Sequence, residues 1–558
     1  MMSDVPDITV NVITHRRRVW LGGLCLLFLA LATRFVGLGS LDLWGDEVYS
    51  WIASTDLITQ LLRWETIENQ AHSPLPFIEM KIARTLLGNS DFSARFFVAV
   101  YSTAAIMAVY LLIGTRVGWG AGFWGALLLC VNPFVLEWGR EARMYSNWLF
   151  YTVLIVALAE AAVVRARRGD WPAALDWRWW LLGIAFMLVH ASNVHAVFTL
   201  AGAGLALGVV VLVEVTVCRR LRAAAIIAAG SLLAASVYLC SWGLTGLGKL
   251  LHYATAPSQM GPAAQPVPMD LLRDIRNVYS MVAGYTPGWW TVVLWGLAIA
   301  GLVILLRRRW VLAVMLIAVA QSAWMSWPML AAKLWFTGRY SFVATLTLSV
   351  GLGTLAAWAW STPVLRRRWV GPALVLGMLT VTAAVWSPVW REIYTVPKMA
   401  VRQALAPIVR HATPDEALVL VPDFYYALSP YYDLGSAPLM RPPHEGRYTP
   451  SSDNPDGGTG PSRKFTLDFD KLVEQGGAAA LPQAVWVFMV VEKSAQESGI
   501  DLRLRQLRRL LEAYGVDDPA HLAECRKAAD APRVLTVTMR ITRGRIDHIT
   551  TTRGRRHR

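Results

Sequence analysis

Long apolar stretches recur through the first 390 residues, separated by short polar turns, and they predict a polytopic bundle of membrane-spanning helices. A helix needs about 20 apolar residues to cross the hydrocarbon core of a bilayer. The first stretch, residues 19–36, lacks a small-residue cleavage site, so we expect a retained span rather than a signal peptide. The eleven predicted segments begin near Val19, Phe92, Trp119, Asn147, Trp179, Ala196, Ala223, Trp289, Trp310, Tyr340 and Trp369.

Clusters of basic residues fall in alternate turns and predict the orientation of the bundle. With the N-terminus (residues 1–18) in the cytoplasm, every cluster lies on the inner side, as the positive-inside rule requires. The outer face then carries a long loop, residues 39–91, and everything after residue 391. The Arg- and Ala-rich composition is typical of bacteria, so we expect a multi-pass protein of a bacterial cytoplasmic membrane. The clusters are His15–Arg18, Arg116, Arg165–Arg168, Arg219–Arg222, Arg307–Arg309 and Arg366–Arg368.

The pattern changes after the membrane domain of residues 19–390, and residues 398–558 predict a soluble α/β domain outside the cytoplasm. Short Val-rich runs, "EALVLV" and "AVWVFMVV", are typical of buried strands, and "RVLTVTMRIT" alternates as a further strand does. The helical spacing of "DLRLRQLRRLLEAYG" ends at Gly515, a common helix stop. A mobile loop is predicted over "GRYTPSSDNPDGGTGPSRK", and a frayed, solvated end over the basic "TRGRRHR".

Composition agrees with a membrane protein. Of the 558 residues, 55% are hydrophobic and only 16% are charged, whereas soluble proteins carry about a quarter charged residues. The net charge of +15 would suggest nucleic acid in a soluble protein. Here the Arg clusters lie between apolar segments, so topology accounts for them and no nucleic-acid partner is expected. The five cysteines are scattered without a CxxC pair, which supports neither a zinc site nor a disulfide framework.

An acidic pair, Asp46 and Glu47 in "LWGDEVYS", follows the first apolar segment. In the simpler interpretation, these acids mark a solvated helix start, where the helix dipole favours them. In the functional interpretation, a carboxylate at this low-dielectric boundary accepts a proton from an attacking hydroxyl. Adjacent residues on a helix point in different directions. One acid can therefore face a cavity while the other fixes its orientation.

Basic and aromatic residues cluster in a second turn, "NPFVLEWGREARMYS". Arg140 and Arg143 are three apart and share a helical face, whereas Glu141 and Tyr145 share another. The arginines either pair with Glu137 or Glu141 as part of the structure, or they hold a phosphate through bidentate hydrogen bonds.

Three more polar clusters are predicted on the outer face. Each has a structural alternative: a loop-to-helix entry capped by Ser90 or Asp91, a satisfied helix break, or snorkelling anchors. Their candidate residues are His72 and Arg95; His190, Asn193 and His195, which could bind a metal or a sugar; and Lys333 with Arg339.

The order of these motifs resembles the GT-C membrane glycosyltransferases. The order is "LWGDEVYS", "HSPLPFIEMKIARTLLGNSDFSARFF", "NPFVLEWGREARMYS" and "GRY", and the resemblance covers roughly residues 19–390. The nearest likeness is to the family-39, polyprenyl-phosphate-mannose type, which includes bacterial lipopolysaccharide glycosyltransferases and aminoarabinose transferases. The resemblance implies inverting transfer of a sugar from a polyprenyl-phosphate carrier to a hydroxyl of a glycan, lipid or protein.

The resemblance also implies roles for individual residues. Asp46, with Glu47 beside it, matches the family's outer-loop acid and would be the general base. The family's His-Pro-Pro-Leu stretch matches residues 72–75, although Ser73 replaces the first proline. Some relatives use a divalent metal and others do not. The residues expected to hold the donor phosphate are Arg140, Arg143, Tyr145, Lys333, Arg339 and Tyr340, and those expected to contact substrate are His72, Arg95, His190 and His195.

Two other classes of protein compete with this interpretation. A lipid-linked sugar flippase or another transporter would place its polar residues near the membrane midplane and often shows inverted repeats. Here the polar residues lie in outer loops, and the sequence shows no repeat. A scaffold that binds cell-wall components would leave the acidic pair and the arginines unexplained.

Overall fold

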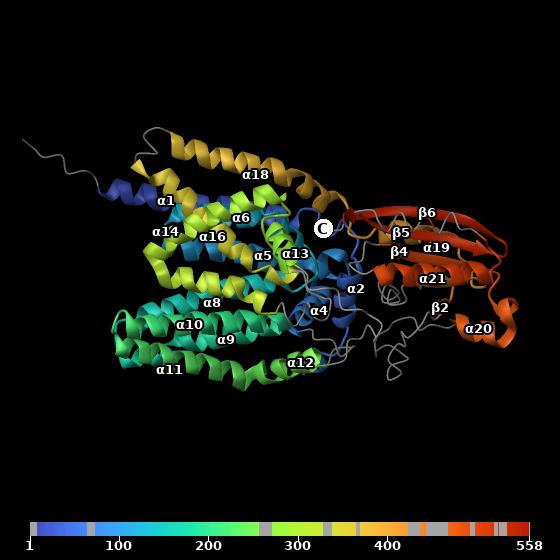
Figure 1. Ribbon diagram of the computed structural model, residues 1–558, viewed down its shortest axis with the longest axis horizontal. Coiled ribbons are helices and arrows are strands. Elements are labelled where there is room, and N and C mark those ends of the chain that lie inside the picture. Colours follow the sequence, from blue (N-terminus) through green and yellow to red (C-terminus); the bar gives the residue numbers. More distant parts are fainter. Residues whose placement is uncertain are drawn as a thin grey trace, which may run out of the picture.

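The computed structural model describes residues 8–63, 73–255, 271–326, 338–363, 369–421, 436–441, 443, 467–491, 497–517, 523 and 533–556. It consists of a bundle of long helices and a sheet domain that lie end to end (Figure 1). The bundle contains α1 (Ile8–Phe35), α5 (Asp91–Arg116), α6 (Trp119–Val131), α8 (Tyr145–Ala166), α9 (Trp177–Ser192), α10 (Val197–Thr216), α11 (Leu221–Tyr238), α14 (Gly288–Gln321), α16 (Ala344–Ser361) and α18 (Val370–Thr395).

Six of the described helical segments are long and apolar enough to cross a membrane, and two shorter apolar helices, 19–35 and 119–131, accompany them. The chain is therefore a multi-pass integral membrane protein. Each predicted segment begins in a helix or within a few residues of one. Two of the segments are joined in α14, where the non-helical backbone of Arg309 (φ −145°, ψ 62°) breaks the helix at the predicted basic turn. Tyr340 lies in a 3-10 turn, Gly338–Ser341, just before α16 begins.

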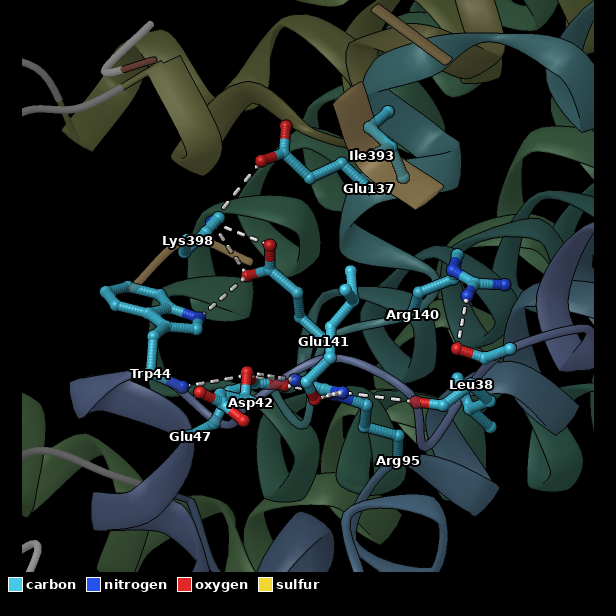
Figure 2. Close-up of a pocket in the computed structure, with 12 residues that line it drawn as sticks. Leu38, Asp42, Trp44, Glu47, Arg95, Glu137, Arg140, Glu141, Ile393 and Lys398 are labelled. Carbon is cyan, nitrogen blue, oxygen red and sulfur yellow. Dashed lines mark hydrogen bonds and ion pairs between the residues drawn. The ribbon is translucent and has the colours of Figure 1, made fainter. Parts of the chain in front are cut away.

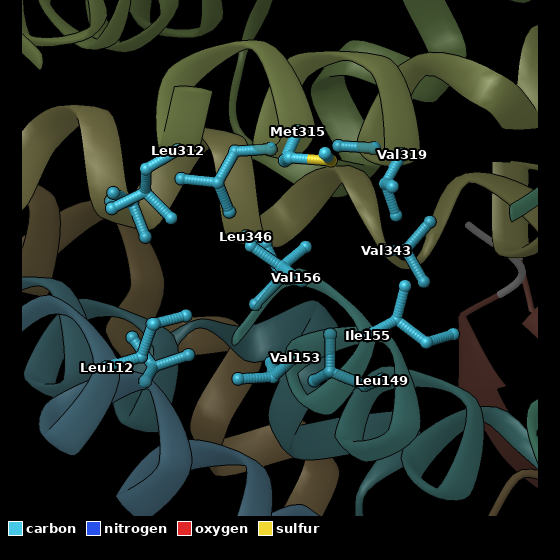
Figure 3. Packing of buried hydrophobic residues seen from close by; sticks show 14 of the residues in the cluster. Leu112, Leu149, Val153, Ile155, Val156, Leu312, Met315, Val319, Val343 and Leu346 are labelled. Atoms are coloured by element: carbon cyan, nitrogen blue, oxygen red, sulfur yellow. The ribbon is translucent and has the colours of Figure 1, made fainter. Parts of the chain in front are cut away.

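The helices pack through small residues and interlocking aliphatic side chains. A Cβ atom on Gly301 of α14 would lie 1.8 Å from the carbonyl oxygen of Gly351 on α16, and one on Gly353 would lie 2.4 Å from the amide nitrogen of Gly125 on α6. Glycine at these positions lets α16 approach both neighbours closely, as is common between membrane helices. Figure 3 shows the adjoining layer of Leu, Val, Ile and Met side chains between α5, α8, α14 and α16.

Basic clusters meet at the end of the bundle that lies away from the sheet domain. Arg116 pairs with Glu160 at 2.9 Å, and its carbonyl oxygen accepts a hydrogen bond from Arg309 Nε at 2.8 Å. Arg167 pairs with the fully buried Glu214 at 2.5 Å. These contacts join turns that are far apart in sequence, so three of the predicted clusters, those that contain Arg116, Arg167 and Arg309, gather at one end of the bundle. Residues 366–368 lie outside the described residues.

Short helices occupy the other end, next to the sheet domain, and α2 and α4 lie between the two bodies (Figure 1). These helices carry the residues of the predicted outer loops. They are α2 (Gly45–Ala53), α3 (Ile58–Leu62), α4 (Leu75–Leu87), α7 (Pro133–Trp138), α12 (Leu244–Thr255) and α13 (Leu271–Val282).

The C-terminal domain has one six-stranded mixed sheet in the order β3-β2-β1-β4-β5-β6. The strands β1 to β4 are parallel, and β5 and β6 continue the sheet antiparallel. The strands are β1 (Ala417–Val421), β2 (Leu439–Arg441), β3 (Leu467–Asp468), β4 (Ala484–Val491), β5 (Arg533–Thr542) and β6 (Arg545–Arg556), and the helices are α19 (Val401–His411), α20 (Phe469–Gly476) and α21 (Glu497–Ala513).

The three predicted strands and the long helix of this domain are present, but the predicted frayed tail was wrong. Residues through Arg556 form β6, which pairs with β5 along most of its length. Pairing satisfies the backbone groups of this segment, and Arg553 stays exposed in the edge strand, so a basic side chain does not prevent the strand. The predicted loop of residues 446–464 lies outside the described residues.

The sheet domain shares a hydrophobic core with α2. Leu405 of α19 and Trp486 of β4 pack in one buried cluster with Val48 and Trp51 of α2. The opposite face of the sheet packs against α21 in a separate cluster. The C-terminal domain is thus joined to the helix that carries the predicted acidic pair.

Candidate active site

The acidic pair lies at the first turn of α2. Trp44 is the N-cap residue, and the Glu47 carboxylate accepts a hydrogen bond from the Trp44 amide at 3.2 Å, which satisfies one of the free donors at this helix start. Asp46 and Glu47 both occupy the first turn, where the helix dipole favours negative charge. From here the two side chains diverge.

Glu47 points into the protein and is fully buried. Its two oxygens accept hydrogen bonds from Arg95 Nε and Nη2, each at 2.7 Å, and from the Ala142 amide at 2.7 Å. Arg95 also donates to the carbonyl oxygens of Leu38 and Leu41. Glu47 and Arg95 therefore tie α2 to α5, to the end of α1 and to the Arg-rich turn, and their charges compensate each other.

Asp46 points toward two arginines from distant parts of the chain. Its Oδ2 lies 3.1 Å from Arg339 Nη1 and 3.8 Å from Arg143 Nη2, and its side chain is 36% exposed. Arg143 also donates from Nη1 to the Asp46 carbonyl oxygen at 3.1 Å and to Ser50 Oγ at 3.0 Å. Burial alone would raise the pKa of Asp46, but Arg143 and Arg339 outweigh it, so the pKa lies below its ordinary value. The acid is thus an ionised, accessible carboxylate.

Aromatic side chains lie beside Arg339, the arginine that pairs with Asp46. Arg339 lies over the Tyr340 ring at 5.7 Å, and Tyr340 in turn packs against His195, with 4.6 Å between ring centroids. Tyr145, at the start of α8, is buried and lies within electrostatic range of Arg339. The structure therefore brings His195, Tyr145 and Tyr340 together with Asp46, Arg143 and Arg339.

His190 is held by a different set of contacts. Its Nδ1 lies 2.6 Å from the Tyr238 hydroxyl, and its carbonyl oxygen accepts a hydrogen bond from Ser73 Oγ at 2.7 Å. A Cβ atom on Gly246 would lie 2.5 Å from the imidazole, so α12 closes over the ring. These contacts support the structural alternative for His190, in which polar side chains at a helix break are satisfied within the protein.

Arg140 caps the C-terminal end of α1. Its guanidinium lies over the Tyr394 ring at 4.5 Å and donates to four main-chain oxygens at the end of that helix. Carbonyl groups at a helix C-terminus favour a cation there. The structure places Arg140 in this role and does not bring it to Asp46. The four acceptors are Thr33, Arg34, Val36 and Gly37. Two other predicted residues, His72 and Lys333, lie outside the described residues.

A buried acid in α4 was missed by the sequence analysis. Glu79 accepts a hydrogen bond from the Tyr101 hydroxyl at 2.6 Å and another from Asn147 Nδ2 at 2.5 Å. Burial raises the pKa of Glu79 to about 7. Glu79, Asn147 and Arg143 line one small cavity of about 250 Å³, so this acid lies one side chain away from Asp46. The available signal was an acid flanked by Ile78 and Met80 in an otherwise apolar helix turn.

A second group missed by the sequence analysis lines a cavity of about 370 Å³ beside Glu47 (Figure 2). Lys398, from the segment between α18 and α19, enters this cavity and pairs with Glu141 at 2.7 Å and with Glu137 at 3.4 Å. Glu137 and Glu141 therefore pair with Lys398, a cation that the sequence analysis did not single out. No sequence spacing links Lys398 to these acids.

The sequence analysis did not decide whether the protein binds a divalent metal. Within the part of the chain that the structure describes, no group of three or more His, Cys, Asp or Glu side chains could hold a metal ion. We therefore assign no residue to a metal.

The fold and the site together define a class of membrane protein. It has a helical bundle with an acid and two arginines at the end that adjoins a mixed sheet domain. No family model and no curated protein matches the sequence. Among solved structures, the chain resembles ArnT from Cupriavidus metallidurans in the apo state, with TM-score 0.51, 14% identity, and coverage of 84% of this chain and 92% of that chain. ArnT bound to undecaprenyl phosphate gives TM-score 0.50, 16% identity, and coverage of 84% and 93%.

A likeness of the same degree extends to archaeal oligosaccharyltransferase AglB from Archaeoglobus fulgidus, in complex with an inhibitory peptide and a dolichol-phosphate. Its TM-score is 0.51 at 13% identity, covering 85% of this chain and 69% of that chain. These likenesses show the fold. The predicted fold class, a GT-C type helical membrane domain with a C-terminal α/β domain, is confirmed as ArnT-like.

Proposed function

We propose that this chain is an integral membrane glycosyltransferase. It moves a sugar from a polyprenyl-phosphate carrier to an acceptor hydroxyl at the outer face of a bacterial cytoplasmic membrane. The observation that carries the proposal is the placement of Asp46 between Arg143 and Arg339 at one end of the bundle. The ArnT-like fold supports it, because ArnT was solved with undecaprenyl phosphate and AglB with a dolichol-phosphate.

The charges of the site suit this reaction. Two arginines face one carboxylate, which leaves a net positive charge for a phosphodiester of the donor. The acceptor oxygen attacks C1 of the sugar, the bond from C1 to the phosphate oxygen breaks, and the acceptor proton passes to Asp46. Arg143 and Arg339 stabilise the negative charge that grows on the departing polyprenyl phosphate. The transition state resembles an oxocarbenium ion, and a single displacement inverts the anomeric centre.

The remaining site residues have two proposed roles: some contact the substrate, and others hold the α2 helix start in place. Tyr145, Tyr340 and His195 lie beside Arg339, and in this proposal they would contact the sugar or the phosphate. Glu47 and Arg95 act through their mutual ion pair and hold the α2 helix start in place. The acceptor is a hydroxyl of a glycan, lipid or protein, and the bilayer presents the donor.

The decisive test replaces Asp46 with Asn in purified protein in detergent. Radiolabelled polyprenyl-phosphate sugars are supplied with membrane extract as acceptor, and loss of label from the carrier is followed. Removing a general base lowers rates by about 100- to 10,000-fold. Asp170→Asn is the matched control, because the Asp170 side chain is 59% exposed and pairs with Arg165 among the basic turns at the other end of the bundle.

Three outcomes distinguish a transferase with Asp46 as its base, a transferase in which Asp46 is not the base, and a flippase. A large loss in Asp46→Asn with full activity in the control supports the assignment of the base. Equal transfer by wild type and Asp46→Asn refutes Asp46 as the base. No transfer from any donor, together with movement of the intact lipid-linked sugar across vesicle membranes, would instead support the flippase interpretation.

A further inference from the structure

A lysine from the segment that leads to the outer domain is enclosed by groups of the membrane domain (Figure 2). The Lys398 ammonium lies 2.7 Å from Oε1 and 2.9 Å from Oε2 of Glu141. It also lies over two indole rings, 4.5 Å from the Trp44 centroid and 4.2 Å from the Trp138 centroid. Two carboxylates and two aromatic faces form a strong site for a cation.

Lys398 supplies positive charge to the acids of this site. The side chains of Glu137 and Glu141 are only 8% and 7% exposed, so their repulsion is weakly screened by water. Two other cations line the cavity: Arg95 pairs with Glu47 and also lies within electrostatic range of Glu141, and Arg140 donates to the end of α1. Removing one partner of a buried ion pair leaves an uncompensated charge and is strongly destabilising.

The pair formed by Lys398 and Glu141 contacts both segments of the candidate active site, which are the start of α2 and the turn that carries Arg143. Glu141 accepts a hydrogen bond from Trp44 Nε1 at 3.3 Å while it binds Lys398. Trp44 is the N-cap of α2, two residues before Asp46, and Glu141 precedes Arg143 by two residues. One ammonium group therefore joins the start of the helix that carries the acid to the turn that carries its arginine.

We propose that Lys398 is a positioning residue that couples docking of the outer domain to assembly of the Asp46–Arg143 pair. This inference rests on the proposed function for its effect on activity, whereas its effect on structure stands by itself. When the outer domain docks, Lys398 enters the site and holds Trp44 against Glu141. When the domain separates, Glu137 and Glu141 lose this cation, and the link through Lys398, Glu141 and Trp44 is lost, so the contacts of Glu47 and Arg143 are left to hold the two segments together.

A neighbouring residue offers a matched control. Arg402 belongs to the start of α19 and pairs with Asp42 at 2.7 Å and with Asp91 at 2.8 Å, but its side chain is 52% exposed. It therefore fastens the same domain to the membrane domain through Asp42 and Asp91, whereas Lys398 binds Glu137 and Glu141. Losing Arg402 removes a docking contact and leaves the Lys398 site intact.

The first measurement uses the protein alone and does not need a substrate. Hydrogen exchange of full-length Lys398→Met and Arg402→Gln is compared with wild type in detergent. We expect amides of residues 45–53 and 140–145 to exchange about tenfold faster in Lys398→Met, with the interior of α8 unchanged. Arg402→Gln should leave residues 45–53 near the wild-type rate. Equal rates in Lys398→Met and wild type, or equal acceleration in both variants, would overturn the proposal.

The second measurement uses transfer activity. A misplaced site lowers the turnover number more than it changes donor KM, so Lys398→Met should lose about 10- to 100-fold in kcat with KM within about threefold. Adding Glu141→Gln to Lys398→Met removes the stranded charge while keeping an acceptor for Trp44, and should recover part of kcat. Absence of any recovery, with KM rising instead, would show that Lys398 contacts substrate and refute a positioning role.

A further variant covers the case in which Lys398→Met does not fold. Trp44→Phe keeps an aromatic ring for the ammonium but removes the Nε1 donor to Glu141, so residues 45–53 should again exchange faster. Unchanged exchange of residues 45–53 in Trp44→Phe would refute the proposal that Trp44 and Glu141 connect Lys398 to α2. If exchange responds as expected but wild type consumes no donor, the proposed function fails while the positioning role stands.

Discussion

Glu79 gives the protein a specific dependence of stability on pH. The perturbation is Glu79→Gln, which keeps the size of the side chain and removes its titration. Glu79 lies in α4, outside the spanning helices, and is 7% exposed among Tyr101, Asn147 and the cavity that Arg143 also lines. Burial raises its pKa from 4.5 to about 7, although the hydrogen bonds from Tyr101 and Asn147 oppose part of the rise.

The sign follows from the raised pKa of the folded state. Folded protein binds the Glu79 proton more tightly than unfolded protein does, so this contribution to stability is full at low pH and is lost as pH rises toward 7. A shift from 4.5 to about 7 corresponds to about 3 kcal/mol in total. Between pH 5 and pH 8, the loss assigned to Glu79 is about 2–3 kcal/mol.

The assay is reversible unfolding in mixed micelles at pH 5 and pH 8, for wild type and for Glu79→Gln. Other groups titrate in both proteins, so the informative quantity is the difference between the two pH dependences. We expect the free energy of unfolding of wild type to fall by about 2–3 kcal/mol more than that of Glu79→Gln over this range. Identical pH dependence in the two proteins would refute the burial argument for Glu79.

Four other predictions concern the remaining elements of the site. Arg339→Met should raise the apparent pKa of Asp46 and move the acid limb of the kcat/KM profile to higher pH, because a cation that favours the carboxylate is lost. Glu47→Gln should destabilise the protein by about 3–5 kcal/mol, measured by unfolding in mixed micelles, because it strands the Arg95 charge. Arg140→Met should lower stability while leaving donor KM unchanged in steady-state kinetics, since its contacts are to the end of α1; a rise in donor KM would contradict this. Gly301→Ala should lower the yield of folded protein in size-exclusion chromatography, because the added Cβ would overlap α16.

Much of the fold could be predicted from local pattern. The apolar segments, the basic turns and the Val-rich strands each depend on residues close in sequence, and the structure contains all of them where it is described. The basic tail was mispredicted because pairing of β6 with β5 depends on a neighbouring strand, and composition alone does not reveal it.

The site was predictable only in part, because its contacts are remote in sequence. The motif order singled out Asp46, Arg143 and Arg339, although Arg339 lies 293 positions from Asp46. The pattern did not separate Arg143, which contacts Asp46, from Arg140, because the two belong to one short turn. Lys398 was missed since its acids lie more than 250 positions away, in another domain.

The shared core between α2 and the sheet domain has a consequence for engineering and for divergence. One buried cluster contains Val48 and Trp51 of the membrane domain together with Leu405 and Trp486 of the C-terminal domain. A graft that brings in a C-terminal domain from another protein would also have to bring a matching face for α2. Substitutions on the two sides of this cluster should therefore occur in compensating pairs, and the C-terminal domain should diverge as a unit with α2 rather than as an interchangeable module.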